Sequence, residues 1–365
     1  MIDLARVQVA PAREAWSRAV SAKMPSFTGS PDPISFFFAD TNADWRVLCR
    51  IFVSMPFKAE GTKRIEEGSM QASHGPRFGK AGWALSVWLM AFAPLGCQER
   101  EAVPRADGQS TPMMVYRPET VTSCAPLAVI SHGAGGSERG YGYLAKALAR
   151  DGFTAIVLGH RESGFQALRD DMLAHGFAQG IRALVTDPNA EQARLLDLEA
   201  ALKWADTQCA APFRVLLGHS MGAETVMLEA GAKNIIGVSS PPAGLDRFDA
   251  YVALSPEGPG IVFPEHAWSG IRKPLLVLTG TRDQSLKGGP EARQIPWQDM
   301  PGSAGQCQWI GVIDQATHMN FAGSGVGAER VEPMVTATVT NFLAGARRHA
   351  CGRPSPVAGM TLQTK

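Results

Sequence analysis

The sequence lacks the patterns of the common nucleotide, nucleic-acid and metal sites. It contains no Lys/Arg-rich run, and 35 basic side chains nearly balance 34 acidic ones, so nucleic acid is not an expected partner. The P-loop pattern G-x-x-x-x-G-K-S/T is absent, and no G-x-G-x-x-G fingerprint opens the chain, which argues against both glycine-rich phosphate cradles. The six cysteines form no C-x-x-C pair and no Cys/His cluster of metal-ligand spacing. Neither a metal site nor a thioredoxin-like motif is therefore expected.

Apolar runs alternate with helical patterns after a polar linker at residues 97–112. This alternation is typical of an α/β protein with a doubly wound, mostly parallel sheet covered on both faces. The seven expected strands are "MMVYRP", "LAVISHG", "FTAIVLGH", "RVLLGHS", "YVALSP", "LLVLTGT" and "QWIGVID". The four expected helices cover about residues 142–150, 190–207, 223–232 and 331–344. The chain has 365 residues, 45% of them hydrophobic, so one domain at residues 113–346 with a C-terminal tail at 347–365 accounts for the pattern.

Residues 70–96 have the layout of a secretory signal peptide. Arg77 and Lys80 precede an apolar stretch from Ala81 to Gly96, and the segment contains no acidic residue. This stretch is shorter than the ~20 residues that span a bilayer, which favours a cleaved signal over a permanent transmembrane helix. We therefore expect an exported protein, either periplasmic or attached by lipid to the membrane of a bacterial cell envelope.

Cys97 offers a route to lipid attachment. The letters "LGC" at residues 95–97 resemble the lipobox of bacterial lipoproteins, in which the cysteine is acylated and becomes the new N-terminus. Pro94 stands where that pattern wants an aliphatic residue, and "AFA" at residues 91–93 fits ordinary signal peptidase. Both processing routes stay open.

Residues 1–69 precede the signal pattern and show no clear periodicity. The letters "EEG" at residues 66–68 can be encoded by the purine-rich GAGGAGGG, which would resemble a ribosome-binding site just ahead of the Met70 codon. We therefore expect translation to start at Met70 and the preceding residues to be a spurious or disordered leader. The alternative is a cytoplasmic extension ahead of a signal anchor.

The stretch "VLLGHSMGAETVM" at residues 215–227 places Ser220 between two glycines. An apolar strand candidate precedes the serine and a helix candidate follows it, so the serine lies at a strand-to-helix turn. In such a turn the hydroxyl projects from the carboxyl edge of the sheet, and the Met221 N–H faces a developing oxyanion. The alternative is a structural glycine-rich turn.

A serine hydroxyl needs a histidine that accepts its proton and a carboxylate that orients the histidine. Asp283 follows the strand "LLVLTGT", and His318 follows "QWIGVID". Taken alone, the first fits a turn cap and the second a loop residue, but their order and strand-end positions match a Ser, Asp, His triad. Glu257 is the reserve carboxylate. A second oxyanion donor is expected in "HGAGGS", where we choose the Ala134 N–H.

The segments "HGAGGS", "GHSMGAE", "TGTRD" and "ATHMNF" together resemble the α/β-hydrolase superfamily over about residues 113–346. They are most similar to its dienelactone hydrolase-like and platelet-activating-factor acetylhydrolase-like branch. The resemblance implies carboxylic ester hydrolysis through an acyl-enzyme, without a cofactor. Dienelactone hydrolases proper have a cysteine at the nucleophile position, which here is serine. The implied roles are nucleophile for Ser220, orienting acid for Asp283, general base for His318, and oxyanion hole for Met221 and Ala134.

The spacing of the later strands predicts an open site. Only residues 257–274 separate "YVALSP" from "LLVLTGT", which leaves no room for a large lid domain. We expect a small-molecule or polymeric ester as the substrate. Candidate acyl-pocket residues, which also fit a plain core, are Phe165, Trp268, Trp297, Met319 and Phe321.

Other readings of the same residues stay open. A thioesterase or an acyltransferase would use the same triad, and a noncatalytic exported lipoprotein could use the fold as a binding scaffold. The oligomeric state is also open. The superfamily topology places the strands near residues 127 and 214 side by side, which implies a disulfide between Cys124 and Cys209. Cys307 and Cys351 could form a second disulfide, which leaves Cys97 for lipid.

Overall fold

The computed structural model describes residues 98–120, 123–239, 247–302, 307–352 and 354–365. The predictions of a leader, a signal peptide and lipidation at Cys97 fall outside these residues. Within the described ranges, no helix is both long enough and apolar enough to cross a membrane.

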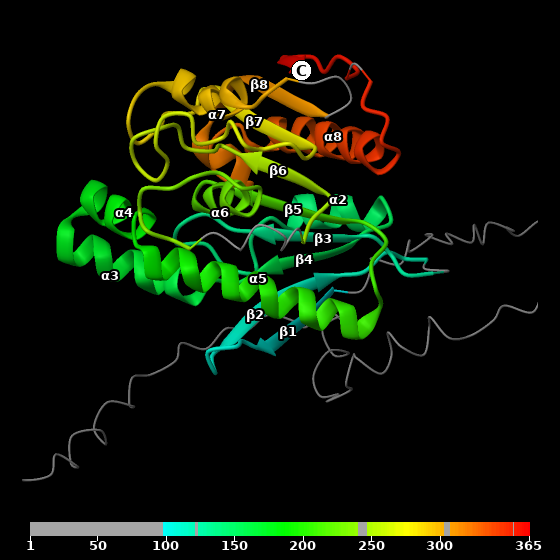
Figure 1. Ribbon diagram of the computed structural model, residues 1–365, viewed down its shortest axis with the longest axis horizontal. Coiled ribbons are helices and arrows are strands. Elements are labelled where there is room, and N and C mark those ends of the chain that lie inside the picture. Colours follow the sequence, from blue (N-terminus) through cyan, green and yellow to red (C-terminus); the bar gives the residue numbers. More distant parts are fainter. Residues whose placement is uncertain (1–97, 121–122, 240–246, 303–306, 353) are drawn as a thin grey trace, which may run out of the picture. The chain divides into compact units, whose positions relative to one another are not determined.

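One mixed sheet organises the described part of the chain (Figure 1). Its strands lie in the order β1-β2-β4-β3-β5-β6-β7-β8-β9. The strands from β4 to β8 in this order are parallel, whereas β1, β2 and β9 pair antiparallel at the two edges. The strands are β1 (Gln98–Pro104), β2 (Ser110–Tyr116), β3 (Leu127–Ser131), β4 (Thr154–Leu158), β5 (Arg214–His219), β6 (Ala250–Leu254), β7 (Leu275–Arg282), β8 (Gln308–Thr317) and β9 (Met360–Thr364).

Helices cover both faces of this sheet. One face packs against α2 (Gly142–Arg150) and α8 (Ala328–Arg347), and the other packs against α5 (Pro188–Gln208) and α6 (Met221–Glu229). Figure 1 shows the long helix α5 in front of the strands. The other helical segments are η1 (Arg161–Ser163), α3 (Phe165–His175), α4 (Phe177–Val185), η2 (Pro290–Gln294), α7 (Ile295–Asp299) and η3 (His318–Ala322).

The central strands are continuous apolar runs because both of their faces are buried. All five residues of β3 and all five of β6 are buried. Along β3, Val129 packs with α5 and α6, whereas Ile130 packs with α2 and α8. Successive side chains of a strand point to opposite faces, so each central strand contributes to two cores. The seven predicted strands and four predicted helices are confirmed.

The prediction of a polar linker at residues 97–112 is wrong. Residues Gln98–Pro104 form β1, which pairs antiparallel with β2 so that Gln98 lies opposite Tyr116. Of the β1 residues only Val103 is fully buried. An edge strand rich in charged residues carries little of the apolar signal by which strands are recognised.

The prediction of a C-terminal tail at residues 347–365 is also wrong. The strand β9 pairs with β8, with Thr364 opposite Trp309, and it closes one edge of the sheet. Its side chains are half-buried or exposed, so the segment carries no continuous apolar run.

A helical hairpin, α3 and α4, follows β4 and was not predicted. The helix α3 buries none of its residues, so it lacks the apolar stripe that marks an amphipathic helix. The hairpin contacts the loop after β3, because a Cβ at Gly135 would lie 2.4 Å from a methyl carbon of Leu168.

Among the described residues, two disulfides tie the periphery to this core. The structure joins Cys124 to Cys209 and Cys307 to Cys351, the two pairs named in the hypothesis. The first bond links the segment before β3 to the end of α5, and Leu127 pairs with Arg214 nearby in the sheet. It closes a loop with a sequence separation of 85 residues.

The Cys124–Cys209 bond makes a testable contribution to stability. We expect the double variant Cys124→Ala/Cys209→Ala to lose about 2–4 kcal/mol of unfolding free energy, because the bond restricts the unfolded chain. Denaturant titrations without reductant measure the loss. With reductant both proteins lack all disulfides and the difference should close. A difference that persisted under reductant would contradict the covalent explanation.

Candidate active site

The turn between β5 and α6 holds Ser220 in a strained backbone conformation. Its φ is 56° and its ψ is −123°, values that residues other than glycine rarely adopt. Its N–H donates to the Leu254 carbonyl at 3.0 Å. A Cβ at Gly218 would lie 2.0 Å from the Gly222 oxygen, and a Cβ at Gly222 would lie 2.1 Å from the Ser131 oxygen. Both glycines are therefore required by close backbone contacts.

The structure brings Ser220, His318 and Asp283 together. His318 Nε2 lies 2.9 Å from the Ser220 hydroxyl oxygen, and His318 Nδ1 lies 2.9 Å from Asp283 Oδ1. The three residues follow β5, β8 and β7 respectively, at the carboxyl edge of the sheet. A carboxylate that accepts from Nδ1–H leaves Nε2 free to accept the serine proton. The arrangement can therefore activate the hydroxyl as a nucleophile.

The environment of Asp283 keeps its carboxyl group ionised. The side chain is fully buried, and its Oδ2 accepts hydrogen bonds from the hydroxyls of Ser255 and Thr279. The Arg293 Nε lies 2.8 Å from Oδ1. Burial alone would raise the pKa of Asp283, but the hydrogen bond from His318 and the charge of Arg293 outweigh it and lower the pKa.

Arg293 on η2 contacts the Asp283 carboxylate, and no sequence motif marks it. Its guanidinium donates to the carbonyl oxygens of Ser255 and Gln284, and so joins the loops after β6 and β7. The reserve carboxylate Glu257 lies 3.4 Å from Arg293 and accepts from the Ser285 hydroxyl and the Leu286 N–H. Glu257 therefore holds the loop after β7, and Asp283 is the carboxylate that contacts His318.

Both predicted oxyanion donors flank the serine turn. Ala134 follows Gly133, where a Cβ would lie 3.1 Å from the Ser220 Cβ. Met221 is the first residue of α6, so its N–H has no intrahelical acceptor. Among the hydrogen bonds of the described residues, neither the Ala134 nor the Met221 N–H donates to a protein acceptor. These amides can receive a developing negative charge.

Three of the five predicted acyl-pocket residues belong to the core instead. Trp268 and Phe321 are fully buried, and Trp297 donates its Nε1–H to the buried Gln308 carbonyl. For these residues the pocket prediction is wrong, because position near a strand end does not decide whether a ring points inward.

Phe165 and Met319 lie differently. Phe165 is 70% exposed and begins α3, whereas Met319 is 52% exposed and follows His318. These two apolar side chains border the carboxyl edge of the sheet.

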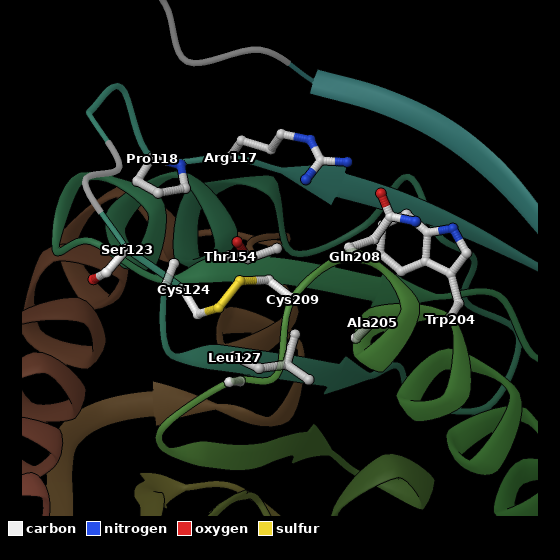
Figure 2. A pocket seen from close by; sticks show the side chains of 12 residues that line it. Arg117, Pro118, Ser123, Cys124, Leu127, Thr154, Trp204, Ala205, Gln208 and Cys209 are labelled. Carbon is white, nitrogen blue, oxygen red and sulfur yellow. A yellow bond between two sulfur atoms is a disulfide. The ribbon is translucent and has the colours of Figure 1, made fainter.

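A separate cavity of about 260 Å³ lies at the other end of the parallel strands, where β3 and β4 begin (Figure 2). Leu127, Thr154, Trp204 and the Cys124–Cys209 disulfide line it. Arg117 is the one charged residue among the described residues that line it, so these residues include no pair of groups for proton transfer. The candidate site is therefore the triad edge and not this cavity.

A buried polar cluster supports the loop that follows β3. Arg194 on α5 donates to the His132 carbonyl at 2.7 Å and to the Ser131 hydroxyl at 3.1 Å. That hydroxyl donates to His160 Nε2 at 2.8 Å, and His160 Nδ1–H donates to Asp197 at 2.8 Å. Burial lowers the pKa of His160 and raises that of Asp197 to about 6. The cluster fixes by directional bonds the start of the loop after β3, residues 132–136, which we call the oxyanion loop because it contains the predicted donor Ala134.

No model of a known protein family matches the sequence, and no curated protein matches it either. Many solved structures are similar, and three of them illustrate the likeness. An esterase of Pyrococcus furiosus is 15% identical, with 68% of this chain and 92% of that one covered and a TM-score of 0.45. An α/β serine hydrolase without lid from Xanthomonas campestris is 17% identical, with 70% and 97% covered and a TM-score of 0.43. A candidate dienelactone hydrolase from Klebsiella pneumoniae is 15% identical, with 67% and 98% covered and a TM-score of 0.46.

The fold itself is of the α/β-hydrolase type. A mostly parallel sheet carries helices on both faces, and a serine occupies a strained strand-to-helix turn. Asp283 and His318 follow later strands in the order that this fold uses. The segment between β6 and β7 holds no large lid domain. The predicted fold class is therefore confirmed.

Glu191, beside the polar cluster, makes folding stability depend on pH. Burial raises its pKa to about 7, against the charge of Arg194 and a hydrogen bond from Thr225. The unfolded carboxyl group, with a pKa of 4.5, loses its proton first as pH rises, so stability falls until the folded carboxyl group also ionises. We expect the unfolding free energy of Glu191→Gln, relative to that of wild type, to increase by on the order of 2 kcal/mol from about pH 5 to about pH 8.

Denaturant unfolding at the two pH values measures this change. Glu199→Gln is the matched control on the same helix, because the Glu199 carboxylate is exposed and pairs with Lys203. The unfolding free energy of the control should differ from that of wild type by the same amount at both pH values. An equal response of the two variants would contradict the assignment to Glu191.

Proposed function

We propose that the protein is a serine hydrolase that cleaves carboxylic esters through an acyl-enzyme. The observation that carries the proposal is the continuous hydrogen-bonded line from Ser220 through His318 to Asp283, with 2.9 Å at each step. Unengaged backbone amides lie beside its serine end. A structural turn would require neither the line nor the strain at the serine.

Each step can be assigned to groups of this chain. The Ser220 oxygen attacks the ester carbonyl carbon while His318 Nε2 takes its proton, and the Met221 and Ala134 N–H groups bind the resulting oxyanion. The intermediate collapses, and the leaving alcohol takes the proton from His318. Water then attacks the acyl-enzyme with His318 as base, which releases the acid and restores the serine. Asp283 stabilises the imidazolium throughout.

The rim of the site supports an accessible ester as the substrate. No large lid stands between β6 and β7, and the exposed Phe165 and Met319 offer apolar surface at the edge of the sheet. A small-molecule ester or an ester within a polymer can reach such a rim. We propose this substrate class and assign no step to a metal or a cofactor.

The proposed location is outside the cytoplasm. The pattern of residues 70–96 and the two disulfides support export, because disulfides persist in oxidising compartments. A periplasmic protein and one attached by lipid at Cys97 both fit this proposal.

A covalent probe tests the nucleophile. We expect a fluorophosphonate to label wild-type protein and the control Ser269→Ala, in which the lost hydroxyl is exposed and donates to the His266 carbonyl. Ser220→Ala should not be labelled, because it lacks the attacking oxygen. In-gel fluorescence or intact mass reads the result. A wild-type protein that is not labelled would favour a noncatalytic binding scaffold.

The choice of carboxylate can be tested separately. We expect Asp283→Asn to lower kcat on p-nitrophenyl acetate by about 10⁴-fold, because the histidine would lose its orienting partner. Glu257→Gln should lose far less, since Glu257 contacts the loop and not His318. Steady-state kinetics with p-nitrophenyl esters of rising chain length provides the measurement and also ranks acyl groups. The reverse order of losses would assign the acid to Glu257.

A further inference from the structure

His219 lies against the catalytic histidine of the proposed triad. It is buried at the end of β5, and its ring centroid is 4.7 Å from that of His318. Its Nε2 is 3.0 Å from the His318 carbonyl oxygen, and its Nδ1 is 2.8 Å from the Tyr141 hydroxyl. A carbonyl oxygen can only accept, so Nε2 carries the hydrogen and Nδ1 is an acceptor. The Tyr141 O–H therefore donates to His219.

The Tyr141 hydroxyl extends this line to the oxyanion loop. Its oxygen accepts the Gly133 N–H at 3.2 Å, and Gly133 immediately precedes the oxyanion donor Ala134. Three hydrogen bonds thus run in one direction, from the Gly133 amide through Tyr141 and His219 to the His318 carbonyl. Each donor in the line has an acceptor, so the line is fully satisfied in a buried setting.

Tyr141 also carries backbone strain. Its φ is 56° and its ψ is 20°, in the left-handed region, immediately before α2. This conformation is costly for a residue with a Cβ and persists only where the surrounding structure enforces it. The buried side chain, whose hydroxyl is bonded at both sides, is such an enforcing contact.

We propose that Tyr141 and His219 are positioning residues that fix the oxyanion loop relative to the catalytic histidine. The proposal rests on the esterase function above. The Ala134 N–H and His318 Nε2 must serve the same tetrahedral intermediate on Ser220, and small errors in their placement cost rate. Displacement of the loop or of the histidine backbone would break a bond of the line.

The role requires a neutral His219 ring. Burial lowers the pKa of His219, and the charge of a protonated His318 lowers it further. A second proton would turn Nδ1 into a donor and leave the Tyr141 O–H without its acceptor. The neutral ring therefore preserves the direction of all three bonds.

Tyr141→Phe tests the line, because it removes the hydroxyl and keeps the ring. We expect kcat on p-nitrophenyl acetate to fall about 10- to 100-fold while KM changes less than about 3-fold. The inhibition constant of a boronic acid, a transition-state analogue, should rise in parallel with the loss of kcat. A side chain that only supports folding would not produce this separation.

Tyr251→Phe is the matched control. It also removes a buried hydroxyl, which donates to the Glu229 carbonyl at 3.2 Å at the start of β6. We expect wild-type kcat from the control, whatever its loss of stability. Equal kcat losses in the Tyr141 and Tyr251 variants would overturn the positioning role.

His219→Asn breaks the same line from its other member, because the shorter side chain cannot reach both partners. We expect the double variant with Tyr141→Phe to lose less kcat than the product of the single losses, since one line is broken only once. Multiplicative losses, or wild-type kcat in either single variant, would overturn the proposal. If Tyr141→Phe does not fold, the kcat of His219→Asn alone tests the positioning role. A wild-type protein that neither hydrolyses esters nor reacts with a fluorophosphonate would instead refute the esterase function.

Discussion

The candidate site depends on one strained turn. Ser220 keeps a backbone conformation that a residue with a Cβ adopts only under constraint, and three neighbouring strands supply that constraint. Its N–H is bonded to Leu254 of β6, Gly218 of β5 meets Gly222, and Gly222 lies against Ser131 of β3. Because these contacts belong to the sheet, the position of Ser220 is set by the core of the fold and not by a free loop.

Buried cations hold the loops on either side of that turn. Arg194 bonds the start of the oxyanion loop, and Arg293 bonds the loops that present Asp283. Each guanidinium is buried and donates several bonds in a fixed plane, which suits arginine better than lysine. The two guanidinium groups thus hold backbone carbonyls and a carboxylate in place by hydrogen bonds for which water cannot compete.

The central sheet and the proposed triad could be predicted because each of the three triad residues directly follows a strand that contains a buried apolar run. The edge strand β1 could not, since its charged residues hide the alternation, and α3 could not, since it buries nothing. The prediction that Trp268 and Phe321 line a pocket failed because spacing along the chain does not determine which way a side chain points. Arg293 carries no motif, as its role arises only from contacts between segments that are distant in sequence.

The pairing of β1 also determines where a lipid attached at Cys97 would lie relative to Ser220. Gln98 lies opposite Tyr116, which pairs with Ala155, and Ala155 pairs with Ala128 near the amino ends of the parallel strands. Ser220 follows the carboxyl end of β5, across the sheet from them. If the protein is attached at Cys97 as proposed, the attachment point would therefore lie at the amino ends of the strands, and Ser220 would lie at the far end of the sheet.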